Sequence, residues 1–221
     1  MPAHPEVTLP DLLAAAAAHG RGGLRFVARD ESERFLPWRE VLARAQEVAG
    51  SLRGLGILPG GRVAIILPTC REFFDAFFGA LLAWAVPVPL YPPVRFGRLA
   101  EYHQQTAAML RAAGTQIVLT EGRLKAVLGE SIAGARPALG CWVIGDLPAA
   151  PYEPVPSLPA QLGLVQFSSG TTVAPKPVAL SPRALVAQAR ALNGFWPERD
   201  GQVVTGVSWL PPIRETFRSS S

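Results

Sequence analysis

The sequence predicts an α/β protein whose sheet is mostly parallel and flanked by helices. Segments with helical periodicity alternate with short apolar segments of strand length along most of the chain. The clearest strand, RVAIILP at 62–68, is apolar without interruption, which is typical of a parallel sheet covered by helices on both faces. With 221 residues, of which 49% are hydrophobic and 17% charged, the chain can bury a substantial core.

The elements before residue 148 are predicted in a regular order. A helix near 9–19 and short strands at 25–28 and 34–36 come first, and an amphipathic helix begins around Pro37 and stops at Gly54. The later elements are a strand at 62–68, a helix at 71–85, a strand at 86–90, a helix at 97–113, a strand at 115–120, a helix at 122–133 and a strand at 141–147.

A proline-rich segment, PAAPYEPVPSLPA at 148–160, indicates a linker or a surface crossing. Beyond it the pattern predicts strands at 162–167, 177–180 and 202–211 and a helix at about 182–194. We therefore expect a first α/β subdomain over 1–147, a linker over 148–160, the start of a second α/β subdomain over 161–211 and a tail over 212–221.

The basic residues do not indicate a nucleic-acid-binding protein. The formal net charge of +4 is spread along the chain and forms no dense basic run. Only Lys125 and Lys176 among the 21 basic residues are lysines, which draws attention to the position of Lys176.

Metal sites, catalytic histidines and membrane spans are also not indicated. Cys70 and Cys141 are the two cysteines, and neither they nor the three scattered histidines show metal-ligand or catalytic spacing. The apolar stretch at 76–91 is shorter than the ~20 residues that a spanning helix needs. Because the N-terminus also lacks a basic region typical of a signal peptide, we expect a cytoplasmic protein.

The stretch QFSSGTTVAPKP at 166–177 lies between two predicted strands and has the composition of an anion-binding loop. A glycine can turn consecutive N–H groups toward one point, hydroxyls donate to phosphate oxygens, and a lysine adds positive charge. The stretch is not a Walker A motif, since no Gly precedes the lysine and Pro177 follows it. A surface hairpin rich in Ser and Thr has the same composition, so composition alone leaves both alternatives open.

QFSSGTTVAPKPVALS resembles the phosphate-binding signature of the adenylate-forming superfamily, a Thr/Ser-Ser-Gly-Thr/Ser-Thr-Gly-x-Pro-Lys-Gly string. Upstream, GILPGGRVAIILPTCREFFDAFFGALLAWAVPVPLYPP resembles the first sheet segment of the same family. VPVPLYPP followed by GRLAEYHQQTAAMLRAAGTQIVLT is more similar to the fatty-acyl-AMP ligases than to the general acyl-CoA synthetases. The resemblance covers roughly residues 8 to 211.

The resemblance implies ATP-dependent activation of a fatty acid to an acyl-adenylate, with release of pyrophosphate. It implies ATP and Mg²⁺ as cofactors, a fatty acid as substrate and, in the full-length family, an acyl carrier protein as a possible partner. The substrate carboxylate is the nucleophile, so the loop supplies none. The family segments that bind Mg²⁺ and carry the catalytic lysine would lie beyond Ser221, so we expect no catalytic residue and no metal ligand in this chain. The residues implied to contact phosphate are Ser168, Ser169, Gly170, Thr171, Thr172 and Lys176.

Two positions depart from the signature. Val173 and Pro177 stand where the family has glycine. A β-branched residue disfavours positive φ, and proline fixes φ and removes an N–H donor. We therefore expect the loop to be stiffer, with weakened ATP affinity.

The C-terminal sequence also departs from the family. VSWLP at 207–211 resembles the start of the next family motif, but PIRETFRSSS follows it. We therefore expect an incomplete N-terminal domain of an adenylate-forming enzyme, from a truncated or frameshifted gene and inactive alone. The alternatives are a non-catalytic α/β module that binds a nucleotide or a partner, and the N-terminal half of a split acyl-CoA synthetase.

An aromatic cluster near residue 75 is predicted to be core rather than a fatty-acid site, since it lies on a helix between two strands. Its members are Phe73, Phe74, Phe77, Phe78 and Trp84. Tyr91-Pro92-Pro93 follows a strand and could form the rim of a cleft, and we interpret it as structural.

Overall fold

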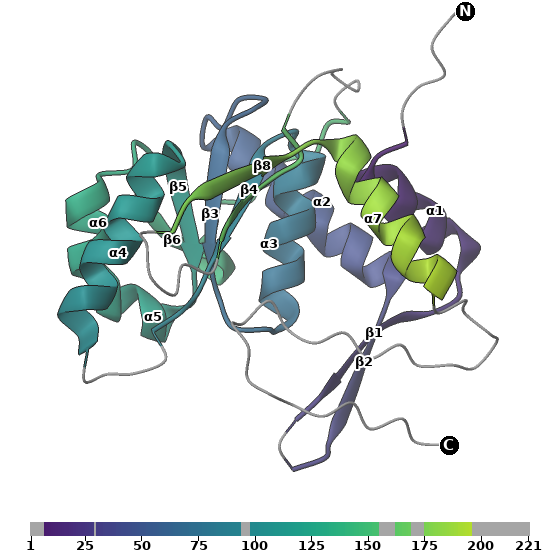
Figure 1. Ribbon diagram of the computed structural model, residues 1–221. Coiled ribbons are helices and arrows are strands. Elements are labelled where there is room, and N and C mark those ends of the chain that lie inside the picture. Colours follow the sequence, from purple (N-terminus) through teal and green to yellow (C-terminus); the bar gives the residue numbers. More distant parts are fainter. Residues whose placement is uncertain (1–6, 29, 94–97, 155–161, 169–174, 196–221) are drawn as a thin grey trace, which may run out of the picture.

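The computed structural model describes residues 7–28, 30–93, 98–154, 162–168 and 175–195 (Figure 1). Its centre is a four-stranded parallel sheet with the strand order β4-β3-β5-β6. The strands are β3 (Arg62–Ile66), β4 (Val86–Leu90), β5 (Thr115–Thr120) and β6 (Cys141–Val143). The predicted α/β class with a mostly parallel sheet is confirmed.

Helices cover both faces of this sheet and make three layers (Figure 1). The covering helices are α2 (Trp38–Gly54), α3 (Arg71–Leu82), α4 (Leu99–Ala112) and α6 (Gly129–Ala135). Val63 and Ile65 of β3 pack in one hydrophobic cluster with α2 and α3. Ala64 and Ile66 pack in another with residues of α4. Successive side chains of a strand point to opposite faces, so both faces of β3 are apolar and its sequence is an unbroken apolar run.

The N-terminal part adds a helix and a hairpin beside α2. Helix α1 (Leu9–His19) begins with a capping box, in which Thr8 and Asp11 satisfy each other's backbone N–H groups. Strands β1 (Gly23–Val27) and β2 (Glu33–Pro37) pair antiparallel and project from the body of the molecule (Figure 1).

Two predicted elements differ from the structure. The helix predicted over 122–133 consists of two short helices, α5 (Gly122–Val127) and α6, which meet at Leu128. Leu128 is fully buried in the hydrophobic cluster that includes residues of β3, β4 and α4, and Gly129, a poor helix former, follows it, so the helix breaks at this point. The strand predicted over 141–147 ends at Val143 and continues as a 3₁₀ turn, Ile144–Asp146.

The described part of the proline-rich segment crosses the surface of α2. A Cβ atom at Gly50 would lie 2.3 Å from the carbonyl oxygen of Ala150, so only glycine allows this close approach. Tyr152 packs against the core cluster that includes α2 and α3. Residues 148–154 therefore run along α2, and the rest of the proline-rich segment lies outside the described residues.

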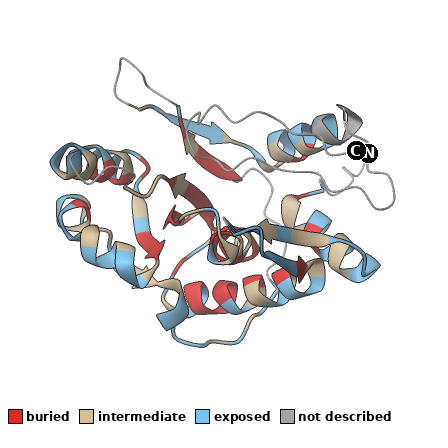
Figure 2. Cartoon of the chain, turned by 90° about the horizontal axis from the view of Figure 1, so that it is seen from below, coloured by how far each residue is buried: buried red, intermediate tan, exposed pale blue. Residues whose placement is uncertain are grey.

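The last described elements are β7 (Leu164–Phe167), β8 (Pro177–Leu180) and α7 (Pro182–Phe195). Strand β7 packs against β4, and its Val165 and Phe167 share a buried cluster with β3 and β4. Figure 2 shows that burial is concentrated in the strands and in the helix sides that face them. The predicted strand at 202–211 and the tail at 212–221 lie outside the described residues.

None of the helices in the described ranges is long and apolar enough to cross a membrane.

Candidate functional site

The hydroxyl-rich stretch is carried by an antiparallel hairpin. Strands β7 and β8 pair from Leu164 opposite Leu180 to Phe167 opposite Pro177. β7 is fully or partly buried along its length, whereas β8 is exposed over its first three residues. The packed strand therefore holds one end of the loop against the core.

Ser168 and Lys176 close the base of this hairpin. The backbone N–H of Ser168 donates to the carbonyl oxygen of Lys176 at 3.0 Å. The N–H of Lys176 donates in turn to the Ser168 hydroxyl oxygen, Oγ, at 3.3 Å. Both residues are exposed, so the Lys176 ammonium group and the Ser168 hydroxyl hydrogen remain accessible to a ligand.

Pro177 fits this register without the loss of a hairpin hydrogen bond. Ser168 and Lys176 form a hydrogen-bonded pair, so the next pair, Phe167 and Pro177, is a non-hydrogen-bonded pair. The N–H group that proline lacks would point away from β7. Proline at the first position of an edge strand is well tolerated for this reason.

The structure describes two of the six residues predicted to contact phosphate. Ser168 and Lys176 lie together at the hairpin base. Ser169, Gly170, Thr171 and Thr172 lie outside the described residues, as does Val173. For these residues the phosphate contacts stay a prediction.

A pocket adjoins the hairpin base at the carboxyl ends of β3, β4 and β7, and we call it the edge pocket. Its lining comes from the β3–α3 connection and α3 (Leu67, Thr69 and Phe73), from the end of β4 (Pro89–Pro92), from α4 (Met109) and from β7 (Gln166 and Phe167). Most of these side chains are apolar. The sequence pattern indicates a structural role for Tyr91 and Pro92, whereas in the structure, where β7 packs against β4, both residues line a pocket.

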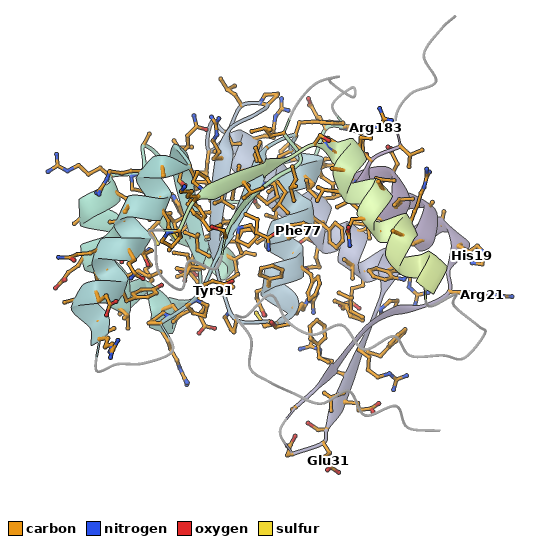
Figure 3. All side chains as sticks on the ribbon, in the orientation of Figure 1. His19, Arg21, Glu31, Phe77, Tyr91 and Arg183 are labelled. Atoms are coloured by element: carbon orange, nitrogen blue, oxygen red, sulfur yellow. The ribbon has the colours of Figure 1, made fainter. Side chains whose placement is uncertain are left out.

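Tyr102 of α4 fixes one side of the edge pocket. Its hydroxyl donates to the carbonyl oxygen of Tyr91 at 2.9 Å, and Tyr91 follows β4 at the edge of the sheet (Figure 3). Burial raises the pKa of Tyr102 to about 12, so the phenol stays protonated and keeps this hydrogen bond at physiological pH. No sequence pattern indicated Tyr102.

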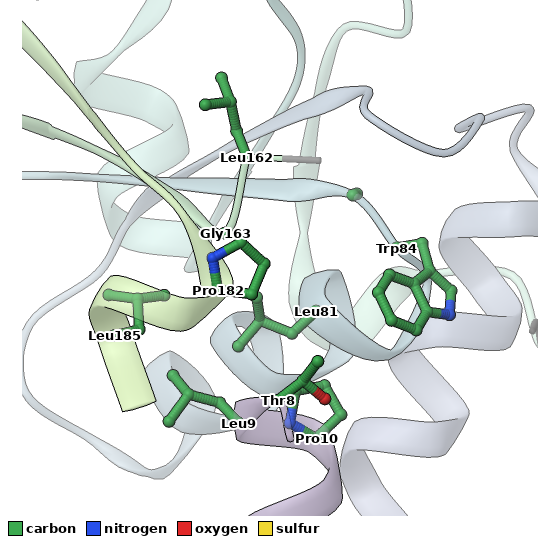
Figure 4. Close-up of a pocket in the computed structure, with 10 residues that line it drawn as sticks. Thr8, Leu9, Pro10, Leu81, Trp84, Leu162, Gly163, Pro182 and Leu185 are labelled. Atoms are coloured by element: carbon green, nitrogen blue, oxygen red, sulfur yellow. The ribbon is translucent and has the colours of Figure 1, made fainter. Parts of the chain in front are cut away.

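A second pocket lies away from the hairpin base, and we call it the helix pocket (Figure 4). It is formed between α1, the end of α3 and the start of α7. Leu9, Leu81 and Leu185 contribute to an apolar lining, and Leu162 stands at its edge with 37% of its surface exposed. None of the residues that line the helix pocket carries a charged side chain.

Asp75 is the most deeply buried carboxylate in the described ranges, at 2% exposure. Its Oδ2 lies 3.6 Å from Nε of Arg71 and 3.7 Å from Nε of Arg44, and its Oδ1 has no hydrogen-bond partner. Burial raises the pKa of Asp75 to about 6, although both guanidinium groups oppose that shift. This cluster lies between α2 and α3 and contributes no residue to either pocket.

The described residues contain no group of three or more His, Cys, Asp or Glu side chains that could hold a metal ion. A lysine and a hydroxyl at an exposed hairpin base can instead bind an anion. The four phenylalanines of the aromatic cluster pack in the core as predicted, with Phe73 and Phe77 buried, and Phe73 also lines the edge pocket. Trp84 does not belong to that core cluster and lines the helix pocket instead.

Comparison with known proteins gives consistent matches. Residues 14–213 match the family model described as AMP-binding enzyme. A long-chain fatty acid–AMP ligase of Mycobacterium marinum is 32% identical over 188 residues, covering 80% of this chain and 31% of the relative. A structure from a study of fatty acyl-adenylate ligases of E. coli and L. pneumophila superimposes with a TM-score of 0.80 and 27% identity, over 89% of this chain and 36% of that one.

A fatty acyl-adenylate ligase of L. pneumophila, solved with acyl adenylate and pyrophosphate, has the same fold, with a TM-score of 0.73 and 21% identity. The match covers 87% of this chain and 33% of that one. This chain thus spans about a third of the length of the relatives that it matches.

Proposed function

This chain belongs to the family of AMP-binding enzymes, and we propose that its β7–β8 hairpin binds the phosphates of ATP in the activation of a carboxylic acid. The observation that supports the proposal most directly is the pairing of Ser168 with Lys176 across the hairpin base. Both residues are exposed, so the hairpin presents a lysine and a hydroxyl at the same point of its surface. The signature residues between them carry the remaining hydroxyls.

The proposed role of the loop is to hold the leaving group. In adenylation the acid carboxylate attacks the α-phosphate of ATP, an acyl–O–P bond forms, and the bond to the β-phosphate breaks to release pyrophosphate. Positive charge and donors beside the β- and γ-phosphates stabilise the charge that the leaving group gains. Lys176 and the hydroxyl of Ser168 are of the right chemical type for this task.

In this proposal Mg²⁺ is bound to the nucleotide rather than held by protein ligands. The described part of the chain offers no cluster of acidic or histidine ligands, whereas Mg²⁺ is commonly bound through substrate phosphates and water. We therefore propose that MgATP enters as one species. Its Mg²⁺ offsets charge on the same phosphates that the hairpin contacts.

A fatty acid as substrate and a carrier protein as acceptor are proposed from the relatives. The matched enzyme of M. marinum is named as a long-chain fatty acid–AMP ligase, and one solved neighbour of this fold pairs an adenylating domain with a peptidyl carrier protein. Because the chain spans about a third of such relatives, we propose that it alone binds nucleotide without turnover.

Calorimetric titration with MgATP tests the phosphate site. The chain has two lysines, so Lys176→Ala can be matched by Lys125→Ala, which removes the same charge from an exposed position on α5. We expect ATP affinity to fall at least tenfold in Lys176→Ala and to stay within twofold in Lys125→Ala. Equal affinities in the two variants would refute the assignment. A separate pyrophosphate-release assay with fatty acids tests turnover.

A further inference from the structure

One edge of strand β8 has no partner strand in the part of the chain that the structure describes. β8 pairs with β7 along its other edge, and the two strands form a sheet of their own. β8 carries no charged side chain, its first three residues are exposed, and Val178 has 45% of its surface exposed. An exposed apolar edge of this kind pairs readily with another strand, because its outward N–H and C=O groups are unpaired.

We propose that β8 of one chain pairs antiparallel with β8 of a second copy of this chain, about a two-fold axis at Ala179. The association makes the two hairpins into one four-stranded sheet. It goes beyond the proposed function and does not rest on it, because none of the residues that pair was assigned to the phosphate site.

The register of the hairpin fixes the position of the axis. Phe167 and Pro177 form a non-hydrogen-bonded pair, so Val165 and Ala179, two positions further along, form another. The backbone groups of Pro177 and Ala179 therefore point away from β7. Since proline has no N–H, Ala179 is the one residue of β8 with both a donor and an acceptor at the free edge. An axis at Ala179 lets the two copies exchange two hydrogen bonds.

The side chains beside this axis match their own copies. With Ala179 opposite the same residue of the second chain, Val178 of each chain lies opposite Leu180 of the other. These are non-hydrogen-bonded pairs, in which the side chains approach most closely, and both members are apolar. The alanine side chains lie on the other face and are small enough to leave the strands free to approach. The edge of β8 is therefore complementary to itself.

The antiparallel arrangement also keeps the two copies of Lys176 apart. In this register Lys176 lies opposite residue 182 of the second chain, so the two lysines are about 20 Å apart along the strands. This separation exceeds the screening length of about 8 Å at physiological ionic strength. A parallel arrangement would instead bring the two ammonium groups side by side. Charge therefore favours the two-fold pairing and leaves both hairpin bases accessible.

Pairing through β8 stops at two copies. The other side of β7 packs against β4 of its own chain, so the paired hairpins present no further free edge. A two-fold contact that uses the same surface on both chains gives a closed dimer rather than a fibre. Because β8 has four residues, the interface is small, and we expect a dimer that dissociates on dilution.

Analytical ultracentrifugation of the full chain over a hundredfold range of concentration tests the association. Wild-type protein should pass from monomer to dimer as its concentration rises. Val178→Lys puts a charge at the paired edge and should weaken the dimer at least tenfold. Val27→Lys is the matched control, since Val27 is an exposed valine (63%) on the β1–β2 hairpin, and it should leave the dimer within twofold. A wild-type protein that stays monomeric, or equal effects of the two variants, would overturn the proposal.

A cysteine variant tests the register and keeps the proposal testable if Val178→Lys unfolds the protein. Residues of a hydrogen-bonded antiparallel pair have Cα atoms about 5.5 Å apart, which is within the range of a disulfide. Ala179→Cys should therefore give a disulfide-linked dimer with oxidised glutathione as the electron acceptor. Val27→Cys retains the same native Cys70 and Cys141 and should give none. No cross-link in Ala179→Cys, or equal yields in the two variants, would overturn the pairing at Ala179.

Discussion

Ser168 and Lys176 exchange two hydrogen bonds across the base of the β7–β8 hairpin, one of them through the serine side chain. The backbone of Lys176, which directly precedes the exposed strand β8, is thereby tied to Ser168 at the end of β7, the strand that packs against β4 of the parallel sheet. A rigid base is what an exposed lysine needs in order to meet a phosphate without a large loss of entropy on binding.

The first prediction concerns the hydroxyl of Ser168. Ser168→Ala removes the acceptor for the Lys176 N–H, which lies at the surface and can bond to water instead. We expect the free energy of unfolding to fall by only about 0.5–1 kcal/mol. The free energy of ATP binding should weaken by more than the free energy of unfolding does, because the variant loses both a hydrogen-bond donor and the bond that positions Lys176. Urea denaturation and calorimetry measure the two effects, and a variant that binds ATP like the wild type would contradict this role.

The second prediction concerns Pro177, where the family signature has glycine. Since the missing N–H would point away from β7, Pro177→Gly should not improve the hairpin. We expect stability to fall by about 0.5–1 kcal/mol, because glycine is freer in the unfolded chain. ATP affinity should stay within twofold. A large gain in ATP affinity on this substitution would show that proline does impair the loop, as its sequence position suggests.

The third prediction concerns Asp75, whose pKa is raised by burial to about 6 from an ordinary value of 3.8. The folded protein holds the proton more tightly than the unfolded chain. This stabilising contribution is complete below about pH 3.8 and is lost as the pH rises through about 6. Asp75→Asn should remove this part of the pH dependence and should be more stable than wild type at pH 8. Denaturant titrations at pH 5 and pH 8 measure it, and a variant less stable than wild type at pH 8 would contradict it.

The fourth prediction concerns the crossing of the proline-rich segment over α2. Gly50→Ala places a Cβ 2.3 Å from the carbonyl oxygen of Ala150, so we expect a loss of about 1–3 kcal/mol in unfolding free energy. Gly129→Ala is the matched control, because its Cβ would meet no atom within 4 Å. Equal stability of the two variants would show that the crossing contributes little. Thermal unfolding and limited proteolysis near residue 150 report the result.

Much of the fold follows from local pattern. The run at 62–68 predicts a central strand, because a strand with apolar side chains on both faces must be covered on both faces. The structure has this strand as β3. The break at Leu128 was not predictable from periodicity, since the apolar spacing continues through it. It depends on where Leu128 reaches the core, which is a tertiary property.

The candidate site was also predictable only where it depends on local sequence. The hairpin is a local feature, so the pattern of strand, loop and strand locates Ser168 and Lys176 correctly at its base. The edge pocket joins residues about a hundred positions apart, such as Leu67 and Phe167. Such contacts depend on the order of strands in the sheet, which periodicity does not specify.

The most direct test of the central claim is the shift in melting temperature caused by MgATP, with adenosine as the control that lacks phosphates. Only a formed site adds binding free energy to the folded state, by about 2.7 kcal/mol when the ligand is present at a hundredfold excess over its Kd. We expect MgATP to raise the melting temperature by several degrees, adenosine to have little effect, and Lys176→Ala to abolish the ATP shift. An ATP shift that is absent, or that adenosine reproduces in full, would contradict a phosphate site at the β7–β8 hairpin.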